Sequence, residues 1–413
     1  MPQKTKTLSQ GCLLSMSIRD LELKDKKILV RVDFNVPLIG KEIADDTRIR
    51  AVLPTIRYVL EKGGIPILLS HLGRPNGKID PNFSLAPCAV RLSEYLEQPV
   101  IMAPDCCGEK VLKLLKNLKP GSVVLLENLR FHEGEEHPEA EPNFASELAD
   151  LGEAYINDAF GAAHRSHASI TYLPQFFPGK AVAGLLMEKE VAFLGTKLIH
   201  PKRPFCAILG GAKISTKFKM IEALRMRADM LLIGGAMAFT FLKAQKKNIG
   251  NSPFESSFIG VANEILSPSK SPECRIFLPV DLIIAKEISP QAEIQCVSVE
   301  DGIPEGFQGV DIGPKTVQIY AEEMKKAATI FWNGPLGIFE IPQFAHGTDA
   351  IAHLLPQTQA ITIVGGGDSL AAIEKAGVAD QISHLSTGGG ASLEYIEWGT
   401  LPGIEALSKN NKK

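Results

Sequence analysis

The chain has 413 residues, of which 45% are hydrophobic and 22% are charged, and its formal net charge at pH 7 is −3. This composition is ordinary for a soluble globular protein, and the small net charge predicts no global attraction to nucleic acid or to an anionic membrane, so any anionic ligand must be held by local groups of Arg and Lys. One hydrophobic core rarely supports a chain of this length, so two domains of about 200 residues each are expected.

The beginning of the chain and its cysteines predict a cytoplasmic protein. Residues 1–15 contain only a very short apolar patch, too short for a signal peptide, and we interpret them as a loose extension or an upstream start before Met16. An organellar transit segment is the weaker alternative. The seven cysteines are irregularly spaced and include no C-x-x-C pair, which predicts reduced thiols in a cytosol-like compartment. No apolar run approaches the length of a membrane-spanning helix.

The first predicted strand begins at residue 27 and ends in Asp33 and Asn35, which alternate with apolar residues. Open α/β sheets bind ligands at the carboxyl ends of their strands, so these polar groups are candidates for ligand contact. The alternative is that they satisfy the backbone of a turn, as Asp and Asn often do. Residues 46–50 then begin a predicted helix that continues to Gly63.

Three further predicted strands in the first half, at 65–70, 122–126 and 154–157, each lead into a loop that carries an arginine. Any one of these arginines is more simply a surface residue, but four in equivalent positions predict a pocket at one edge of a sheet. Because guanidinium groups bind carboxylate and phosphate bidentately, the expected ligand is small and carries both groups. The four arginines are Arg48, Arg74, Arg130 and Arg165, and the same loops contain His71, His164 and His167.

The segment 132–137 contains two histidines and three glutamates, which resembles a group of metal ligands. The spacing differs from H-E-x-x-H, and Gly134 indicates an exposed loop. We therefore predict that this segment is solvated.

An amphipathic helix predicted at 185–194 is flanked by glycines and is followed by the proline-rich, basic segment 200–204. Such a segment is the most plausible domain boundary in the chain.

The predicted strand 205–209 stops at Gly210 and Gly211, and helical spacing resumes after Lys217. Glycines allow close approach of a ligand to the backbone, and free amides at a helix N-terminus favour phosphate. Lys213 would share a helical face with Lys217 if the turn is already helical. A plain strand-to-helix connection remains an equal alternative, and the Walker motif G-x-x-x-x-G-K-[ST] is absent from the chain.

Glycine turns recur at strand-to-helix junctions of the second half, including 234–235, 365–367 and 388–390. Their amides are suited to a nucleotide site, and Asp368 at a helix start is a candidate Mg²⁺ ligand. Asp368 is also a favoured helix N-cap, which is the competing interpretation. A further strand, 276–279, is expected to end before Asp281.

Taken together, these segments closely resemble the phosphoglycerate kinase family. From about Met16 to the end of the chain the matching stretches occur in order, and Ser369 replaces the threonine expected after GGGD while keeping a hydroxyl group. The stretches are RVDFNVP (31–37), SHLGRP (70–75), LENLRF (126–131), NDAFGAAHRSHAS (157–169), LGGAKISTK (209–217), WNGPLGIFE (332–340), GGGDS (365–369) and STGGGASLE (386–394).

The resemblance implies an α/β protein with two doubly wound parallel-sheet (Rossmann-like) domains joined by a hinge helix. A glycerate-binding domain would cover residues 16–184, with residues 401–413 packing back on it. Residues 185–200 would form the interdomain helix and linker, with 185–194 as the hinge. Residues 201–400 would form the nucleotide-binding domain.

The resemblance also implies the ligands and the residues that bind them. The expected ligands are 3-phosphoglycerate or 1,3-bisphosphoglycerate, and ADP or ATP with Mg²⁺, bound by a monomer. The expected glycerate-binding residues are Asp33, Asn35, Arg48, His71, Leu72, Gly73, Arg74, Arg130 and Arg165. The expected nucleotide-binding residues are Lys213, Lys217, Gly234, Gly235, Asn333, Glu340, Gly366, Gly367, Asp368 (also the metal ligand) and Ser369, with Gly388, Gly389 and Gly390 as an anion site.

The implied reaction is reversible phosphoryl transfer between 1,3-bisphosphoglycerate and ADP, in glycolysis and gluconeogenesis, with Arg48 and Lys217 as catalytic residues. The transition state of such a transfer is loose, so cations and oriented amides supply most of the catalysis, and closure of the two domains would exclude water.

Two alternatives compete with this interpretation. A dinucleotide-dependent dehydrogenase would need G-x-G-x-x-G after the first strand, and that motif is absent there. A non-enzymatic anion-binding protein would keep the fold but lose catalytic groups, whereas every recognisable motif is populated here.

Overall fold

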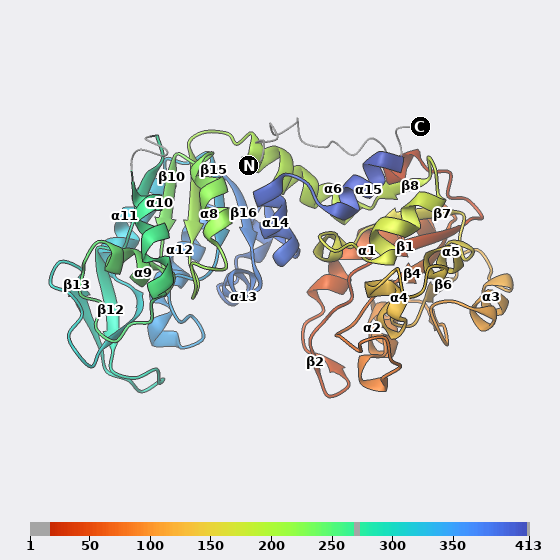
Figure 1. Cartoon of the computed structure of the whole chain (residues 1–413), viewed down its shortest axis with the longest axis horizontal. Coiled ribbons are helices and arrows are strands. Elements are labelled where there is room, and N and C mark those ends of the chain that lie inside the picture. The colour runs from red at the N-terminus through yellow and green to blue at the C-terminus, as the bar shows by residue number, and fades with distance from the viewer. Residues whose placement is uncertain (1–16, 268–272, 411–413) are drawn as a thin grey trace. The chain divides into compact units, whose positions relative to one another are not determined.

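The computed structural model describes residues 17–267 and 273–410. Within this part the chain divides into two compact units, residues 17–192 with 398–410 and residues 193–397 (Figure 1). The loose extension predicted at 1–15 lies outside the described residues, as do Met16 and the last three residues. The domain limits predicted from the sequence, and the interdomain role of residues 185–200, stay predictions.

The first unit is built on a six-stranded parallel sheet in the order β5-β6-β4-β1-β7-β8. The central strands are buried along almost their whole length, as strands covered by helices on both faces must be. Arg31 of β1 pairs with Leu69 of β4 and with Asn157 of β7, so these three strands end level and their following loops begin together. The strands are β1 (Lys27–Arg31), β4 (Ile65–Leu69), β5 (Val100–Met102), β6 (Val123–Leu125), β7 (Ala154–Asn157) and β8 (Ala181–Ala183), and β2 (Leu38–Ile39) and β3 (Glu42–Ile43) form a separate hairpin.

Helix α1 illustrates how the sequence forms the layer above this sheet. Ile49, Val52, Ile56 and Val59 recur at helical spacing and are all buried in the core of the unit, with Ile28 and Val30 of the sheet. Near the other end of the chain, α15 packs against β8 and against the segment 168–176. The helices are α1 (Thr47–Glu61), α2 (Ala86–Leu96), α3 (Glu109–Lys116), α4 (Glu133–Glu136), α5 (Phe144–Ala149), α6 (Leu185–Glu190) and α15 (Pro402–Asn410). In addition, η3 (Leu129–Phe131) is a short 3-10 helix and η5 (Ala168–Tyr172) is a short π-helix.

The second unit contains its own six-stranded parallel sheet in the order β11-β10-β9-β15-β16-β17. The chain passes from β9 to β10 on one side and later returns to β15 on the other, so the strand order reverses at β9. In open α/β sheets ligands bind at such a reversal, outside the carboxyl ends of the strands. The strands are β9 (Phe205–Leu209), β10 (Met230–Ile233), β11 (Arg275–Phe277), β15 (Thr329–Asn333), β16 (Ile361–Gly365) and β17 (His384–Ser386).

A three-stranded antiparallel sheet, β13-β12-β14, was not predicted from the sequence. Asp281 is the first residue of β12 rather than part of a loop after the preceding strand, and it is buried. Its carboxylate accepts hydrogen bonds from the Lys315 and Thr316 amides at the start of α11, which makes it a structural cap. The strands are β12 (Asp281–Ala285), β13 (Ile294–Ser298) and β14 (Gln308–Ile312).

The helices of the second unit surround the core built on Trp332, Ile208 and Leu232. The two parallel sheets with their helices confirm the α/β class and the doubly wound parallel architecture predicted from the sequence. No helix in the described ranges 17–267 and 273–410 is long and apolar enough to cross a membrane. The helices are α7 (Lys197–Ile199), α8 (Phe218–Arg225), α9 (Met237–Ala244), α10 (Ile259–Leu266), α11 (Pro314–Met324), α12 (His346–Leu354), α13 (Gly367–Lys375) and α14 (Gly390–Trp398).

The amphipathic helix predicted at 185–194 begins where expected but changes its winding. Helix α6 ends at Glu190, a π-helical segment follows at η7 (Val191–Thr196), and α7 continues to Ile199. The division between the two units falls inside this π-helical segment, after Ala192.

Candidate functional site

In the first unit, the loops after β1 and β4 are joined by side chains of the RVDFNVP and SHLGRP stretches. The Asn35 side-chain oxygen accepts a hydrogen bond from the Gly73 amide at 3.0 Å. The neighbouring Leu72 is buried, and its amide and carbonyl both bond to the Asn128 side chain, which belongs to the loop after β6. Three of the predicted strand-end loops are therefore connected at one edge of the sheet.

Arg48 lies in the first turn of α1, and only one of its three guanidinium nitrogens bonds to the part of the protein that the structure describes. Its Nη1 donates to both carboxylate oxygens of Asp33 and to the carbonyl of Asn35, each at 3.1 Å. Within the described ranges, Nε and Nη2 of Arg48 have no partner. The guanidinium is thus fixed in place with most of its donors available to a ligand.

Arg130 is nearly buried and bonds to the loop after β4. Its Nη1 donates to the Gly73 carbonyl at 2.6 Å, and its Nη2 lies 3.2 Å from a carboxylate oxygen of Glu136. The buried Nε has no hydrogen-bond partner in the part of the chain that the structure describes. Burial lowers the pKa of Arg130, but a guanidinium stays charged at neutral pH.

A buried ion pair that sequence reasoning missed lies behind these residues. Arg31 and Glu135 are both fully buried and lie 3.6 Å apart, and each bonds to the hydroxyl of Ser169. Burial raises the pKa of Glu135, while Arg31 opposes that shift. Arg31 was visible in the sequence as a charged residue inside an apolar strand, which is a signal that such a residue has a buried partner.

The structure corrects the prediction that segment 132–137 is a solvated loop. Residues Glu133–Glu136 form the short helix α4, and Glu135 is completely buried. The prediction was wrong for this residue because the glutamate is compensated by Arg31 from β1 and by Ser169, which are distant in the sequence.

The histidines of the site are held neutral by burial and by the surrounding cations. His71 is buried, its Nδ1 lies 3.2 Å from Nη2 of Arg31, and burial followed by Arg31 lowers its pKa well below the usual range. Because an arginine can only donate, Nδ1 of His71 accepts and its Nε2 carries the proton. Burial, and then Arg130, lowers the pKa of His167 to about 3.

Arg74 and Arg165 differ from the arginines above because both are exposed. Among the described residues, neither side chain makes a hydrogen bond or an ion pair. They are therefore free cations in the loops after β4 and β7, beside a site whose other charges are already balanced. A ligand with several negative charges would complete the charge balance.

In the second unit, three glycine turns interlock backbone to backbone at the carboxyl ends of β9, β10 and β15. The Gly210 and Gly211 amides donate to the carbonyls of Asn333 and Pro335, and the Gly235 amide donates to the Leu336 carbonyl. A Cβ at Gly210 would lie 2.1 Å from the Pro335 carbonyl oxygen, and one at Gly235 would lie 2.5 Å from the Gly211 nitrogen. These contacts require glycine at both positions.

Lys217 lies under these turns. Its ammonium donates to the carbonyls of Gly210 at 2.8 Å and Asn333 at 3.1 Å. Burial lowers the pKa of Lys217 to about 8, and the nearby Asp368 opposes that shift. The amine is protonated at neutral pH, but its desolvated charge would be stabilised further by an anion.

Lys213 does not share a helical face with Lys217, because residues 213–217 form turns and α8 begins only at Phe218. Lys213 is exposed. The shared face was predicted only if residues 213–217 were already helical, and they are not. The two lysines therefore lie in different surroundings.

The turn after β16 connects Asn333, Ser369 and Asp368. The Asn333 side chain donates to the Gly365 carbonyl at 2.7 Å, and the Ser369 hydroxyl accepts from the Gly334 amide at 2.5 Å. Helix α13 then begins at Gly367, after Gly366 with φ +95°. Asp368 does not cap this helix: its carboxylate is exposed and makes no hydrogen bond to any residue that the structure describes. That leaves it open to a cation.

A cavity of about 260 Å³ adjoins these turns within the second unit. Its wall is mostly apolar and includes the carboxylates of Asp311, Glu340 and Asp368. This is the usual arrangement for a flat ring with a charged tail. The lining includes Gly211, Gly235, Phe239, Leu336, Glu340 and Asp368.

Four predicted glycines of the second unit do not line the cavity. Gly234 is buried, and a Cβ there would meet the Leu336 side chain at 2.6 Å, so it packs beneath the turn. Gly388, Gly389 and Gly390 lie after β17 and start α14. Neither Gly234 nor these three residues line the cavity.

Comparisons with known proteins all lead to one family. A family model described as phosphoglycerate kinase matches residues 18–398. The chain is similar to a phosphoglycerate kinase of Chlamydia muridarum, with 51% identity over 396 residues that cover 95% of this chain and 98% of that protein. The relative from Chlamydia felis is 52% identical over the same shares. The solved structure of phosphoglycerate kinase from Coxiella burnetii has a TM-score of 0.86 and 39% identity, covering 96% of this chain and 100% of that one.

Proposed function

The chain belongs to the phosphoglycerate kinase family, and from this premise we propose how its two sites share the reaction. The protein is a phosphotransferase of glycolysis that transfers a phosphoryl group reversibly between 1,3-bisphosphoglycerate and ADP, forming 3-phosphoglycerate and ATP. The assignment of each residue to a step is our proposal.

The glycerate ligand binds at the carboxyl edge of the first unit's sheet. The observation that carries this proposal is the gathering of four arginines from the loops around β1, β4, β6 and β7, two of which, Arg74 and Arg165, have no partner of their own among the described residues. A phosphate and a carboxylate together supply the negative charge that these cations lack. Neutral His71 donates one hydrogen bond through Nε2 without adding to the positive charge.

The buried residues behind this site position the ligand contacts. Arg31 and Glu135 neutralise each other, and both bond to the hydroxyl of Ser169. Arg31 also donates to Nδ1 of His71, which fixes the orientation of the imidazole ring that we assign to the ligand. Gly73 is held from both sides, by Asn35 at its amide and by Arg130 at its carbonyl. The site is therefore rigid before the ligand arrives, which reduces the entropy lost on binding.

The nucleotide binds at the glycine turns of the second unit. The mostly apolar cavity accommodates the base, and the phosphates lie toward the first amides of α13, because the amides of Gly210, Gly211 and Gly235 already donate to carbonyls. The exposed Lys213 and the partly buried Lys217 supply positive charge. Glu340 lines the same cavity and accepts hydrogen bonds from the sugar.

Asp368 is the residue that fits Mg²⁺. An exposed carboxylate with no hydrogen-bond partner in the described ranges is a hard oxygen ligand of the kind that Mg²⁺ prefers when it is bound by one or two carboxylates and by phosphates. When bound, the ion neutralises charge on the nucleotide phosphates.

Phosphoryl transfer needs no covalent enzyme intermediate, because its loose transition state is stabilised by positive charge and by oriented donors. We assign Arg48 and Lys217 to this role. Arg48 offers the donors that Asp33 does not use, and Lys217 carries a desolvated ammonium whose interaction with an anion is strengthened by burial.

Direct transfer also requires the two substrates to approach in line. We propose that residues 185–194, in the interdomain segment 185–200, act as the hinge that permits this approach and the exclusion of water. We propose that the chain acts as a monomer, since the assigned roles need no group from a second chain, and that it acts in the cytoplasm, where irregularly spaced cysteines stay reduced.

The proposal is tested by measuring ATP formation from 1,3-bisphosphoglycerate in a coupled assay, together with calorimetric binding of 3-phosphoglycerate to Arg74→Ala and Arg50→Ala. Arg50 is the matched control, since it is on the same helix as Arg48 but pairs with Asp46 at the surface. Loss of one charge-assisted contact of about 1.5–3 kcal/mol predicts roughly 10-fold to 100-fold weaker binding to Arg74→Ala. Unchanged affinity in Arg74→Ala, or equal losses in both variants, would remove Arg74 from the site.

A further inference from the structure

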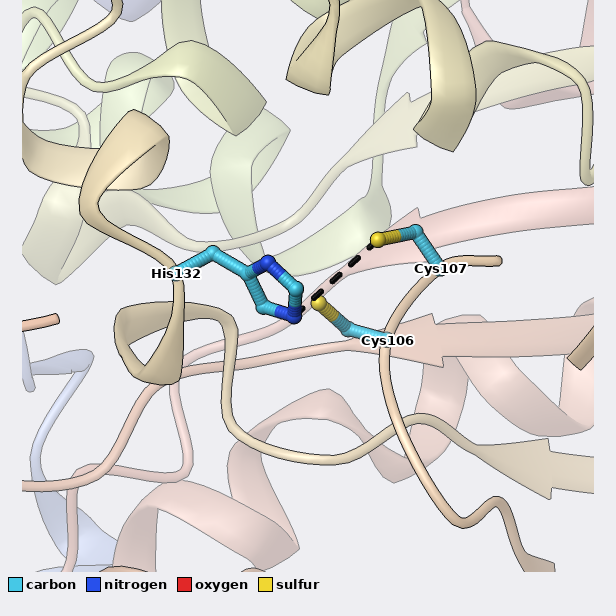
Figure 2. A group of neighbouring side chains, drawn as sticks. All are labelled: Cys106, Cys107 and His132. Carbon is cyan, nitrogen blue, oxygen red and sulfur yellow. Dashed lines mark hydrogen bonds between the residues drawn. The ribbon is translucent and has the colours of Figure 1, made fainter. Parts of the chain in front are cut away.

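Two adjacent cysteines and a histidine form a cluster that the phosphoryl-transfer site does not use. Cys106 and Cys107 lie in the loop between β5 and α3, and His132 lies between η3 and α4 (Figure 2). The Cys107 sulfur is 4.0 Å from Nε2 of His132, and the two sulfurs and the imidazole nitrogen all lie within 4.8 Å of one another. Both sulfurs thus face the same imidazole edge.

Carboxylates hold this imidazole in its charged form. Oδ1 of Asp105 lies 2.8 Å from Nε2 of His132, and a carboxylate oxygen of Glu141 lies 3.8 Å from Nδ1. The ring also stacks on Phe144, with 5.2 Å between the ring centroids. The bond to Asp105, followed by that to Cys107, raises the pKa of His132 to about 10. His132 is therefore an imidazolium at neutral pH.

The two sulfurs are in opposite protonation states. The hydrogen bond from Cys106, and then the bond and charge of His132, lower the pKa of Cys107 to about 6, against the opposing effects of burial and of Glu147 on α5. Burial raises the pKa of Cys106 well above its usual value. At neutral pH a thiolate at Cys107 lies beside a thiol and an imidazolium, whose Nε2 proton is shared between Asp105 at 2.8 Å and the sulfur at 4.0 Å.

Accessibility also separates these two residues. Both residues are buried, but 7% of the Cys107 surface is exposed and none of Cys106, so Cys107 is the more accessible of the two. Elsewhere in the described ranges Cys88, Cys206, Cys274 and Cys296 have pKa values that are raised, chiefly by burial. A depressed pKa and a cationic neighbour mark reactive cysteines, and among the described cysteines Cys107 combines both.

We propose that Cys107 is a site of reversible oxidation by hydroperoxides, with Cys106 as the thiol that closes a disulfide to it. In the first step the thiolate sulfur attacks a peroxide oxygen, an S–O bond forms and the O–O bond breaks. His132 gives its proton to the departing oxygen, which leaves as an alcohol or as water. The sulfur loses two electrons and becomes a sulfenic acid, while the peroxide is reduced.

In the second step the Cys106 sulfur attacks the sulfenic sulfur. An S–S bond forms, the S–O bond breaks, and the oxygen leaves as water with the proton of Cys106. Adjacent Cα atoms are about 3.8 Å apart, closer than the separation of about 4.4–6.8 Å at which disulfides are usually found. The bond is therefore strained and easily reduced by a dithiol, as expected for a reversible modification rather than a structural link.

The test begins with the pH dependence of alkylation in the full-length protein. Iodoacetamide should alkylate Cys107 with a rate that reaches half its maximum near pH 6, and His132→Gln should shift that midpoint upward. Cys296 is the internal control, because it is exposed but has a raised pKa, so its midpoint should lie above 9. A midpoint for Cys107 at or above that of Cys296 would overturn the proposal.

Peroxide treatment followed by peptide mass spectrometry tests the two chemical steps. The peptide that contains both cysteines should lose two hydrogen atoms in the wild type and regain them with dithiothreitol. Cys106→Ser should instead accumulate a sulfenic acid at position 107 that dimedone traps, and Cys107→Ser should stay unmodified. An unchanged wild-type peptide, oxidation of Cys106 in Cys107→Ser, or a stoichiometric Zn²⁺ that co-purifies and blocks alkylation would each refute the proposal.

Discussion

Replacing Lys217 with Met tests the electrostatic basis of catalysis in the second unit. Burial lowers the pKa of this amine from 10.5 to about 8, and the difference corresponds to a charging cost of about 3 kcal/mol in the folded chain. Below the lower value both folded and unfolded chains carry the proton. As the pH rises from about 8 to 10.5, the folded chain has lost a proton that the unfolded chain still binds. The free energy of unfolding of the wild type must therefore increase with pH in this window.

Lys217→Met keeps an apolar stem but cannot titrate, so this increase should be missing from the variant. The hydrogen bonds lost at the Gly210 and Asn333 carbonyls add a constant offset at low pH, and their weakening on deprotonation is already contained in the shifted pKa. Relative to the variant, the wild type should gain about 2–3 kcal/mol between about pH 7 and about pH 10. Turnover of the variant should fall by about 100-fold or more, with nearly unchanged affinity for 3-phosphoglycerate.

The assay is urea unfolding of both proteins at the two pH values. Fluorescence of Trp332 reports on the second unit, since this residue is fully buried there, and Trp398→Phe in both proteins removes the one other tryptophan. A stability difference that does not change with pH would refute a desolvated ammonium at position 217. Lost glycerate affinity would show that the lysine is assigned to the wrong site.

Three further predictions concern the other sites. Glu135→Ala should destabilise the first unit by about 3–5 kcal/mol in urea unfolding because it leaves Arg31 buried without a counter-charge, and Glu135→Gln should cost less; equal stability of Glu135→Ala and wild type would contradict the buried pair. Asp368→Asn should raise the Mg²⁺ concentration needed for half-maximal rate about 10-fold or more, and an unaltered Mg²⁺ titration would exclude Asp368 as a ligand. Gly210→Ala should abolish ADP binding in calorimetry while 3-phosphoglycerate still binds, whereas normal ADP affinity would show that the turns are not the nucleotide site.

The parallel strands and their polar ends were predictable because they depend on local pattern. A continuous apolar run such as 205–209 predicts a buried strand that ends where glycine or polar residues begin. Because neighbouring strands are parallel and in register, their carboxyl ends lie at the same edge of the sheet. The antiparallel sheet β13-β12-β14 was missed because β13 is largely exposed and carries no apolar run, so only its pairing with β12 makes it a strand.

The charge state of the candidate site could not be predicted from the sequence. Glu135 and Glu136 are neighbours in a run of acidic residues, yet one is fully buried against Arg31 and the other bonds to Arg130 at the edge. The same holds for Lys217, whose depressed pKa results from burial by turns that are distant in the chain. Burial of a charge depends on partners far away in sequence, which spacing does not reveal.

The interlocked glycine turns also limit how the protein can recover from mutation. At Gly309 an added methyl would meet the ring of Phe239 at 2.3 Å, and a smaller side chain at 239 could make room for it. At Gly210 the obstacle is the carbonyl oxygen of Pro335, which every amino acid carries. Suppressor selections should therefore yield compensating changes for Gly309→Ala but only true revertants for Gly210→Ala.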